Sequence, residues 1–156
     1  MPRETKVSAK RRSSYRSRVF IGGSYHQEAR DRLDNIKSAV KRAGYQPVVA
    51  DEVQLENAED IHHETMVLLH SCRLAIFELS QLSGALMEIE RLPDYGAKSL
   101  ILYADPDNRG WLISRMLTTF VYQHQSLIQA RGYVRLETMQ EYIATWLEEM
   151  RKGGLG

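Results

Sequence analysis

Short apolar runs alternate with amphipathic segments from Arg18 onward, and this alternation constrains the fold more than any single motif does. Each apolar run has the length of a strand buried in a sheet, and each amphipathic segment repeats its apolar residues at helical spacing. Strands are expected at residues 19–21, 47–50, 73–79, 98–103 and 133–136. Helices are expected at residues 27–42, 58–70, 84–92, 111–118 and 139–150.

Particular residues define the ends and the inward faces of these helices. Gly44 is expected to close the first helix as a C-cap, and Pro93 is expected to break the third. Aromatic residues at helical spacing are more often part of a core than of a base-stacking surface. On this ground four aromatic residues are assigned to the core: Trp111, Phe120, Tyr122 and Trp146.

Alternating strands and helices predict an α/β fold in which helices cover both faces of a parallel sheet. With right-handed crossovers and about five strands, the leading topology is the flavodoxin-like three-layer sandwich with strand order 2-1-3-4-5. The switch point of that order lies between the first and third strands, and ligands bind at the carboxyl ends of the strands there. The loop at residues 22–25 is therefore expected beside the loop at residues 83–88.

The basic residues are unevenly distributed and divide the chain into a tail and a body. Residues 1–17 hold six Lys or Arg, one acid and almost no apolar residues, so a flexible basic tail is expected. Residues 18–152 are expected to form a single domain, and the chain beyond residue 17 holds 15 basic and 19 acidic residues. Such a mildly acidic body argues against a dedicated nucleic-acid binder. The tail could contact nucleic acid or acidic lipid, and a solvated solubility tail is the simpler alternative.

Several classes of protein are disfavoured by what the sequence lacks. Cys72 is the only cysteine, and its apolar neighbours predict a buried thiol. No apolar run reaches the length of a membrane span and no hydrophobic signal segment occurs, so a cytoplasmic protein without membrane contact is expected. Neither G-x-G-x-x-G nor a P-loop pattern is present. Glu59 and His62 form a single E-x-x-H pair, which is too few for a di-metal site, so no metal is expected.

One carboxylate closely follows the third expected strand. The strand at residues 73–79 leads into a polar turn and then into the first turns of a helix that carries Glu88. This order places Glu88 near the carboxyl edge of the sheet, where ligands bind in open α/β folds. An acid in a first helical turn also complements the helix dipole, and that is the alternative explanation of Glu88.

A glycine pair follows the first expected strand. Gly22 and Gly23 would let a backbone approach a ligand closely, and Ser24 and Tyr25 add hydroxyl groups and an aromatic ring. A glycine pair after a strand is also a common way to build a tight turn. The pair therefore supports a binding loop only in combination with the loop that leads to Glu88.

Two motifs taken together resemble a known family. The first is V-F-I-G-G-S-Y at residues 19–25, and the second is I-F-E-L at residues 76–79, followed by Ser83, Gly84 and Glu88. This combination resembles the nucleoside 2-deoxyribosyltransferase-like superfamily and the related TIR domains that cleave NAD. The resemblance covers roughly residues 18–104 and is one of pattern. Both families are flavodoxin-like and place a glutamate after the third strand, where it acts on the C1′ carbon of a ribosyl group.

The resemblance implies a role for each matching residue. Glu88 would be the catalytic carboxylate, attacking the anomeric carbon or stabilising the oxocarbenium-like charge as the base departs. Residues near it would hold the ribose, pack on the base and leave room for the substrate. Asp51 joins this group because it follows the second strand. The residues implied to bind substrate are Gly22, Gly23, Ser24, Tyr25, Asp51, Ser83 and Gly84.

Two positions depart from the pattern of these families. Arg73 stands where the third strand commonly opens with aspartate, and Glu90 stands where a glycine commonly follows the glutamate. The lost glycine would narrow access to the site or mark a non-catalytic relative. No clear second acid of a deoxyribosyltransferase is found either, which favours TIR-style chemistry or binding without turnover.

Three functions therefore stay open. The first is cleavage or transfer at the N-glycosidic bond of NAD, a nucleoside or a nucleotide, with a role in defence signalling and no required cofactor. The second is a catalytically silent nucleotide sensor, and the third is an assembly module. TIR-type proteins commonly self-associate, so the resemblance also implies a homo-oligomer.

Overall fold

The computed structural model describes residues 17–23, 27–49, 67, 69–80, 89, 92–94, 96–105 and 115–154. The strands are β1 (Arg18–Gly23), β2 (Gln46–Val49), β3 (Leu74–Glu78), β4 (Lys98–Ala104) and β5 (Ile128–Tyr133). The helices with described bounds are α2 (Gln27–Arg42), α5 (Arg115–Gln123) and α6 (Leu136–Lys152).

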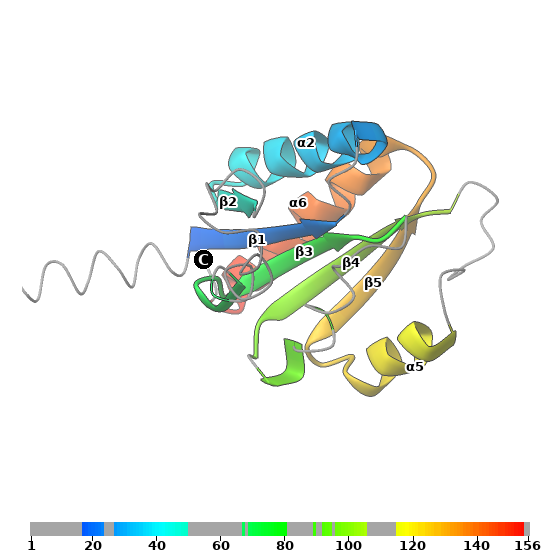
Figure 1. The fold of residues 1–156 in the computed structure, drawn as a ribbon. Coiled ribbons are helices and arrows are strands. Elements are labelled where there is room, and N and C mark those ends of the chain that lie inside the picture. The colour runs from blue at the N-terminus through cyan, green and yellow to red at the C-terminus, as the bar shows by residue number, and fades with distance from the viewer. Residues whose placement is uncertain are drawn as a thin grey trace, which may run out of the picture.

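The five strands form one parallel sheet in the order β2-β1-β3-β4-β5, which confirms the topology that the sequence predicted (Figure 1). β1 lies beside β3 in a register that runs from Val19 with Leu74 to Gly23 with Glu78. Every residue of β3 is buried, as expected for a strand that is central in the sheet and covered on both faces. The fold is therefore the α/β, Rossmann-like arrangement of a flavodoxin-like sandwich.

Alternate residues of each strand feed two separate hydrophobic cores. Helices α2 and α6 lie side by side on one face of the sheet, where Ile36 and Trp146 pack with Ile76 (Figure 1). On the opposite face Phe20 and Phe77 are in contact, with ring centroids 5.8 Å apart, and α5 covers part of this second core. The core in which a described helix packs determines which face of the sheet that helix covers.

Helix α2 has the bounds that the sequence predicted. Leu33, Ile36 and Val40 are buried on its inward face, as their spacing indicated. The chain turns at Gly44, which has a φ of 87°, and the Tyr45 N–H donates to the carbonyl of Val40 across this turn. Gly44 is therefore the C-cap that the sequence predicted, because glycine adopts this left-handed conformation without steric cost.

The predicted position of the fifth strand was wrong. The apolar run at residues 133–136 suggested a strand, but β5 ends at Tyr133, and Leu136 begins α6. Val134 is 60% exposed, so it does not belong to the core. The strand itself contains the polar residues Gln129 and Arg131, which an edge strand tolerates because one of its sides is open.

Three expected helix ends also differ from the structure. Residues 92–94 are helical, so helical structure extends beyond Leu92, where the sequence predicted an end at Pro93. The left-handed residue that follows is Gly96, with a φ of 68°, and its N–H donates to the carbonyl of Leu92. Helix α5 runs on to Gln123 rather than ending near residue 118, and α6 begins at Leu136 rather than at residue 139.

Other expectations are confirmed or corrected by burial. The Cys72 thiol is buried, and burial raises its pKa from 9.0 to about 11, so it stays protonated at neutral pH. Trp146 lies in a core as predicted, whereas Tyr122 is 72% exposed and does not.

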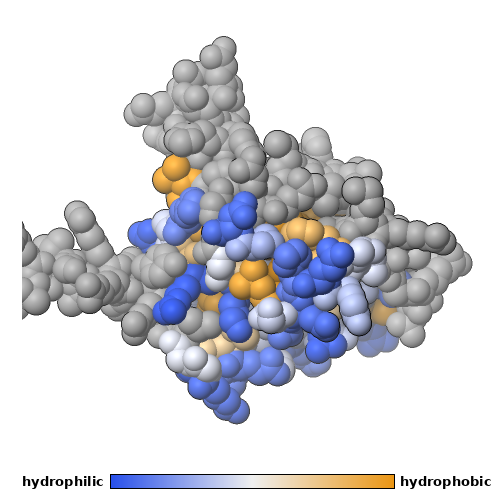
Figure 2. Space-filling view, turned by 90° about the horizontal axis from the view of Figure 1, so that it is seen from below, coloured by the Kyte–Doolittle hydropathy of each residue, from blue (hydrophilic) through white to orange (hydrophobic). Residues whose placement is uncertain are grey.

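The described part of the surface in Figure 2 is largely hydrophilic, with small hydrophobic patches. No helix in the described ranges is long and apolar enough to cross a membrane.

Gly22 allows the central strands to pack closely. A Cβ atom at this position would lie 2.7 Å from Cδ1 of Phe77 on the paired strand, and 3.2 Å from Cε1 of Phe20. The first distance is shorter than real Cβ contacts reach. The hydrogen atom in place of a side chain therefore makes room for the Phe77 ring in the core.

We expect Gly22→Ala to lower the free energy of unfolding by about 1–3 kcal/mol, because the added methyl group overpacks the core against Phe77. Urea denaturation monitored by circular dichroism would measure the change. Gly153→Ala is the matched control, since a Cβ there meets nothing closer than 3.5 Å. Equal stability of the two variants would contradict the packing role of Gly22.

Candidate active site at the carboxyl edge of the sheet

The carboxyl ends of β1 and β3 lie side by side and form a topological switch point. Gly23 pairs with Glu78 at these ends. Beyond β1 the chain enters α2 on one face of the sheet, whereas Ile89 and Leu92, which follow β3, pack in the core on the opposite face. Open α/β folds bind ligands beside strand ends whose chains diverge in this way.

The structure describes two of the residues that the sequence assigned to the site. Gly22 and Gly23 end β1 at the switch point, and Gly23 lies against its partner strand, because a Cβ there would be 3.0 Å from the carbonyl oxygen of Glu78. Both glycines thus have a packing role, and their role in ligand binding stays a prediction. The other assigned residues lie outside the described residues: Ser24, Tyr25, Asp51, Ser83, Gly84 and Glu88.

A buried carboxylate that the sequence analysis did not single out stands at this edge. Glu78, the last residue of β3, is 5% exposed. Its Oε1 accepts a hydrogen bond of 2.5 Å from the backbone N–H of Ser80. Its Oε2 accepts a bond of 2.8 Å from the Ser80 hydroxyl and a further bond from the hydroxyl of Tyr133. Three donors thus compensate the desolvation of this carboxylate, which burial alone would make costly.

Ser80 and Tyr133 join three strands around this carboxylate. The backbone N–H of Ala104, at the end of β4, donates to the Ser80 hydroxyl oxygen over 2.7 Å. The hydroxyl groups of Ser80 and Tyr133 lie 3.4 Å apart. Tyr133 ends β5, so the network links the carboxyl ends of β3, β4 and β5.

The phenol of Tyr133 is held in its neutral form. Burial raises its pKa above the ordinary value of 10.0, and the Glu78 carboxylate adds to the rise by its charge and its hydrogen bond. The charge of Arg32 opposes this rise, so the guanidinium of α2 acts on the same group of residues. Tyr133 therefore serves as a hydrogen-bond donor over the whole physiological range.

Two further charged groups lie at this edge. Asp105 follows β4 and is 4% exposed, and its backbone N–H donates to the carbonyl of Tyr133 over 2.8 Å. Nη1 of Arg32 is buried, and no group of the described residues accepts a hydrogen bond from it. The described ranges contain no cluster of His, Cys, Asp and Glu residues that could hold a metal ion. The edge thus offers carboxylates, hydroxyl groups and one guanidinium with an unused donor.

We expect Tyr133→Phe to lower the free energy of unfolding at pH 7 by about 1–3 kcal/mol, because Glu78 loses a donor in a buried site. The pH dependence should change as well. A raised pKa in the folded state contributes stability that is complete below the unfolded value near 10 and is lost as pH rises above it.

Urea titrations from pH 7 to pH 11 would measure both effects. The wild type should lose stability above pH 10 more steeply than Tyr133→Phe, by up to about 1.4 kcal/mol per pH unit. Tyr122→Phe is the control, because this tyrosine is 72% exposed. Parallel curves for wild type and Tyr133→Phe would contradict the assigned environment of the phenol.

Known proteins match this chain in structure and not in sequence. No family model and no curated protein matches it. The structure of the CMP N-glycosidase BcmB of Clostridium botulinum aligns with a TM-score of 0.56 and 16% identity, over 83% of this chain and 98% of that one. A de novo designed Rossmann 2x3 protein aligns with a TM-score of 0.50 and 16% identity, over 90% of this chain and 93% of the design. At these identities the comparisons establish a shared fold.

Proposed function

We propose that this chain cleaves or transfers the N-glycosidic bond of a nucleotide, a nucleoside or NAD, with Glu88 as the catalytic carboxylate. The observation that carries the proposal is the switch point at which Gly23 pairs with Glu78. The segment that contains Glu88 follows β3, and open α/β folds bind ligands beside such strand ends.

The chemistry that we propose needs a carboxylate and no cofactor. As the bond from C1′ to the base breaks, positive charge develops on the sugar, and an ionised carboxylate stabilises that charge or forms a bond to C1′. Water or an acceptor then takes the sugar. Glu78 is poorly suited to this task because both of its oxygens already accept hydrogen bonds, so we keep Glu88 in this role.

The fold comparison supports the class of reaction that we propose. BcmB is named as a CMP N-glycosidase, and nearly its whole length aligns with this chain. Action on NAD, self-association in the TIR style and a role in defence signalling rest on the resemblance of the sequence. They are narrower forms of the same proposal.

An unused cationic donor favours a nucleotide over a nucleoside as the substrate. Arg32 acts electrostatically on Tyr133 at the carboxyl edge, and its buried Nη1 donates to no group of the described residues. A guanidinium is well suited to bind phosphate oxygens through charge-assisted hydrogen bonds. We therefore propose that Arg32 binds the phosphate of a nucleoside monophosphate.

Glu88→Gln should lower the rate of base release from the substrate by at least about a hundredfold, because the amide cannot stabilise the sugar cation as a carboxylate does. The assay incubates the purified protein with NAD and a panel of nucleosides and nucleotides, and detects the free base by chromatography. Glu90→Gln is the matched control and should keep its activity, because residues two apart on a helix do not share a face.

If no compound of the panel released its base, the proposed enzymatic activity would be refuted. Ligand binding by the wild type and by Glu88→Gln, measured by calorimetry on the same panel, would then identify a nucleotide sensor. Glu90, which replaces the glycine of the related families, is the feature of the sequence that favours this second function.

Arg32→Gln should raise KM for a nucleoside monophosphate about tenfold or more and change KM for the matching nucleoside little, because the nucleoside has no phosphate to bind. Steady-state kinetics with both substrates would measure the difference. Arg42→Gln is a control on the same helix, at the end away from the site. An equal change in KM for both substrates would exclude a phosphate contact.

A further inference from the structure

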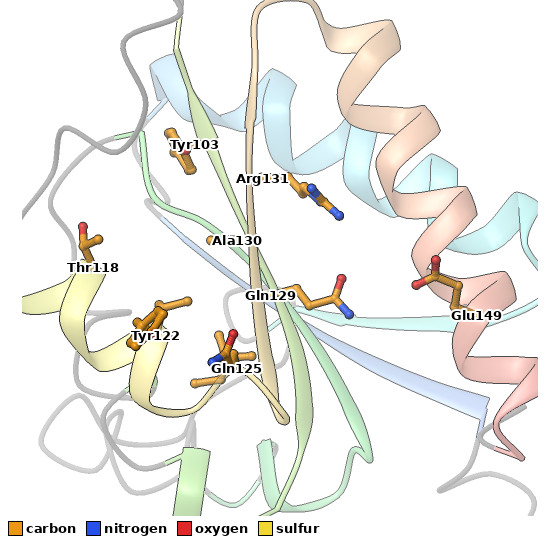
Figure 3. Close-up of a pocket in the computed structure, with 10 residues that line it drawn as sticks. Tyr103, Thr118, Tyr122, Gln125, Gln129, Ala130, Arg131 and Glu149 are labelled. Atoms are coloured by element: carbon orange, nitrogen blue, oxygen red, sulfur yellow. The ribbon is translucent and has the colours of Figure 1, made fainter.

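A groove runs along the open side of β5, away from the switch point. It has a volume of about 580 Å³, and β5, α5 and α6 line it. Gln129 and Arg131 point to the side of Glu149 on α6, whereas Thr118 and Tyr122 of α5 lie on the other side of the strand (Figure 3). The edge of β5 thus forms the floor of the groove, between two helices.

The peptide groups at the centre of β5 point into this groove. The carbonyl of Leu127 accepts a hydrogen bond of 3.0 Å from the N–H of Ser99 in β4, and the carbonyl of Tyr133 accepts one of 2.8 Å from the N–H of Asp105, just after β4. Peptide groups alternate in direction along a strand, so the N–H and C=O groups of Ala130 and Gly132 point away from β4. Within the described ranges no strand pairs with them. An exposed edge of this kind is a template for another strand.

One large exposed apolar side chain lines the groove, and two more follow the end of β5 in the sequence. In the described part of the chain four large apolar residues are exposed, and three of them border β5: Tyr122 at 72%, Val134 at 60% and Leu136 at 37%. Tyr122 lines the groove, and the other two follow the end of β5. Exposed apolar surface around an unpaired strand indicates a contact surface for a protein.

We propose that a second copy of this chain occupies the groove and pairs its β5 antiparallel to the first, about a two-fold axis at Ala130. Ala130 is the central residue whose peptide groups point outward, so the two Ala130 residues would exchange both hydrogen bonds. Ile128 of each copy would then lie opposite Gly132 of the other. The result is a homodimer with one continuous sheet, and its interface is the same surface on both copies.

The charges beside β5 are complementary in this register. Gln129 of one copy lies opposite Arg131 of the other, on the face that carries α6. Because Gln129 points to the side of Glu149, which lines the same groove, Arg131 of one copy would lie on the side of Glu149 of the other (Figure 3). In the single chain neither side chain forms an ion pair with a described residue. The two-fold axis gives two such pairs of Arg131 and Glu149 in the dimer. This charge complementarity favours a second copy of the chain over an unrelated peptide as the occupant of the groove.

The dimer does not depend on the proposed enzymatic function, so the two can fail separately. The first test is the oligomeric state of the full chain, by sedimentation velocity over a range of concentrations. Ala130→Pro should give a monomer, because proline removes the outward N–H while the bonds of β5 to β4 involve the alternate residues. Circular dichroism would confirm that the variant is folded.

Charge exchange gives a second test that does not depend on the proline variant. Arg131→Glu and Glu149→Arg should each weaken the dimer about tenfold, and the double variant should restore it. Glu141→Arg is the control on α6 and should leave the dimer unchanged. Glu141 lines a different groove, between α2 and α6.

A wild-type chain that stays monomeric at high micromolar concentration would overturn the proposal, whether or not a peptide binds the groove. A dimer that is unaffected by both single charge reversals would overturn it as well. A weaker dimer in each single variant and a restored dimer in the double variant would establish both the surface and the register.

Discussion

The burial of Glu78 is the constraint on which the carboxyl edge of the sheet depends. β3 is central and buried along its whole length, so its last side chain is taken out of water. A carboxylate in such a place needs donors, and the turn at Ser80 and the hydroxyl of Tyr133 supply them. Tyr133 can do so only if β5 ends beside β4 at the same level. The buried carboxylate of Glu78 at the end of β3 therefore requires that β5 ends with Tyr133 at the same level.

This network also determines which polar groups at the same edge remain available to bind a ligand. Glu78 has its oxygens occupied and Tyr133 is kept neutral, so both serve as a fixed support. Arg32 differs from them because one of its buried nitrogens has no acceptor among the described residues. A rigid polar support with one unused cationic donor is suited to an anionic ligand, because the support need not rearrange when the ligand binds.

The two proposed sites lie at different edges of the sheet. The carboxyl ends of β1 and β3 form the proposed substrate crevice, and the side of β5 forms the proposed dimer surface. In the proposed dimer β5 connects the dimer surface with the carboxyl edge of the sheet. It carries Ala130 on the two-fold axis and Tyr133 in the hydrogen-bond network of Glu78. Dimerisation would therefore stiffen the strand that carries the Tyr133 donor, and would leave the switch point open.

The sequence by itself predicted the fold class and the bounds of α2, because buried strands and amphipathic helices differ in the local period of their apolar residues. The leading strand order rested on the usual handedness of crossovers, and the tertiary structure decided it. The sequence placed Gly22 and Gly23 in a turn after the first strand, whereas the structure makes them the last two paired residues of β1. It misplaced β5, because the polar residues Gln129 and Arg131 hide an edge strand from a search for apolar runs. It also passed over the bond between Glu78 and Tyr133, which are 55 positions apart. Only the tertiary structure decided that pairing, because the need of a buried carboxylate for donors arises when the sheet closes around it.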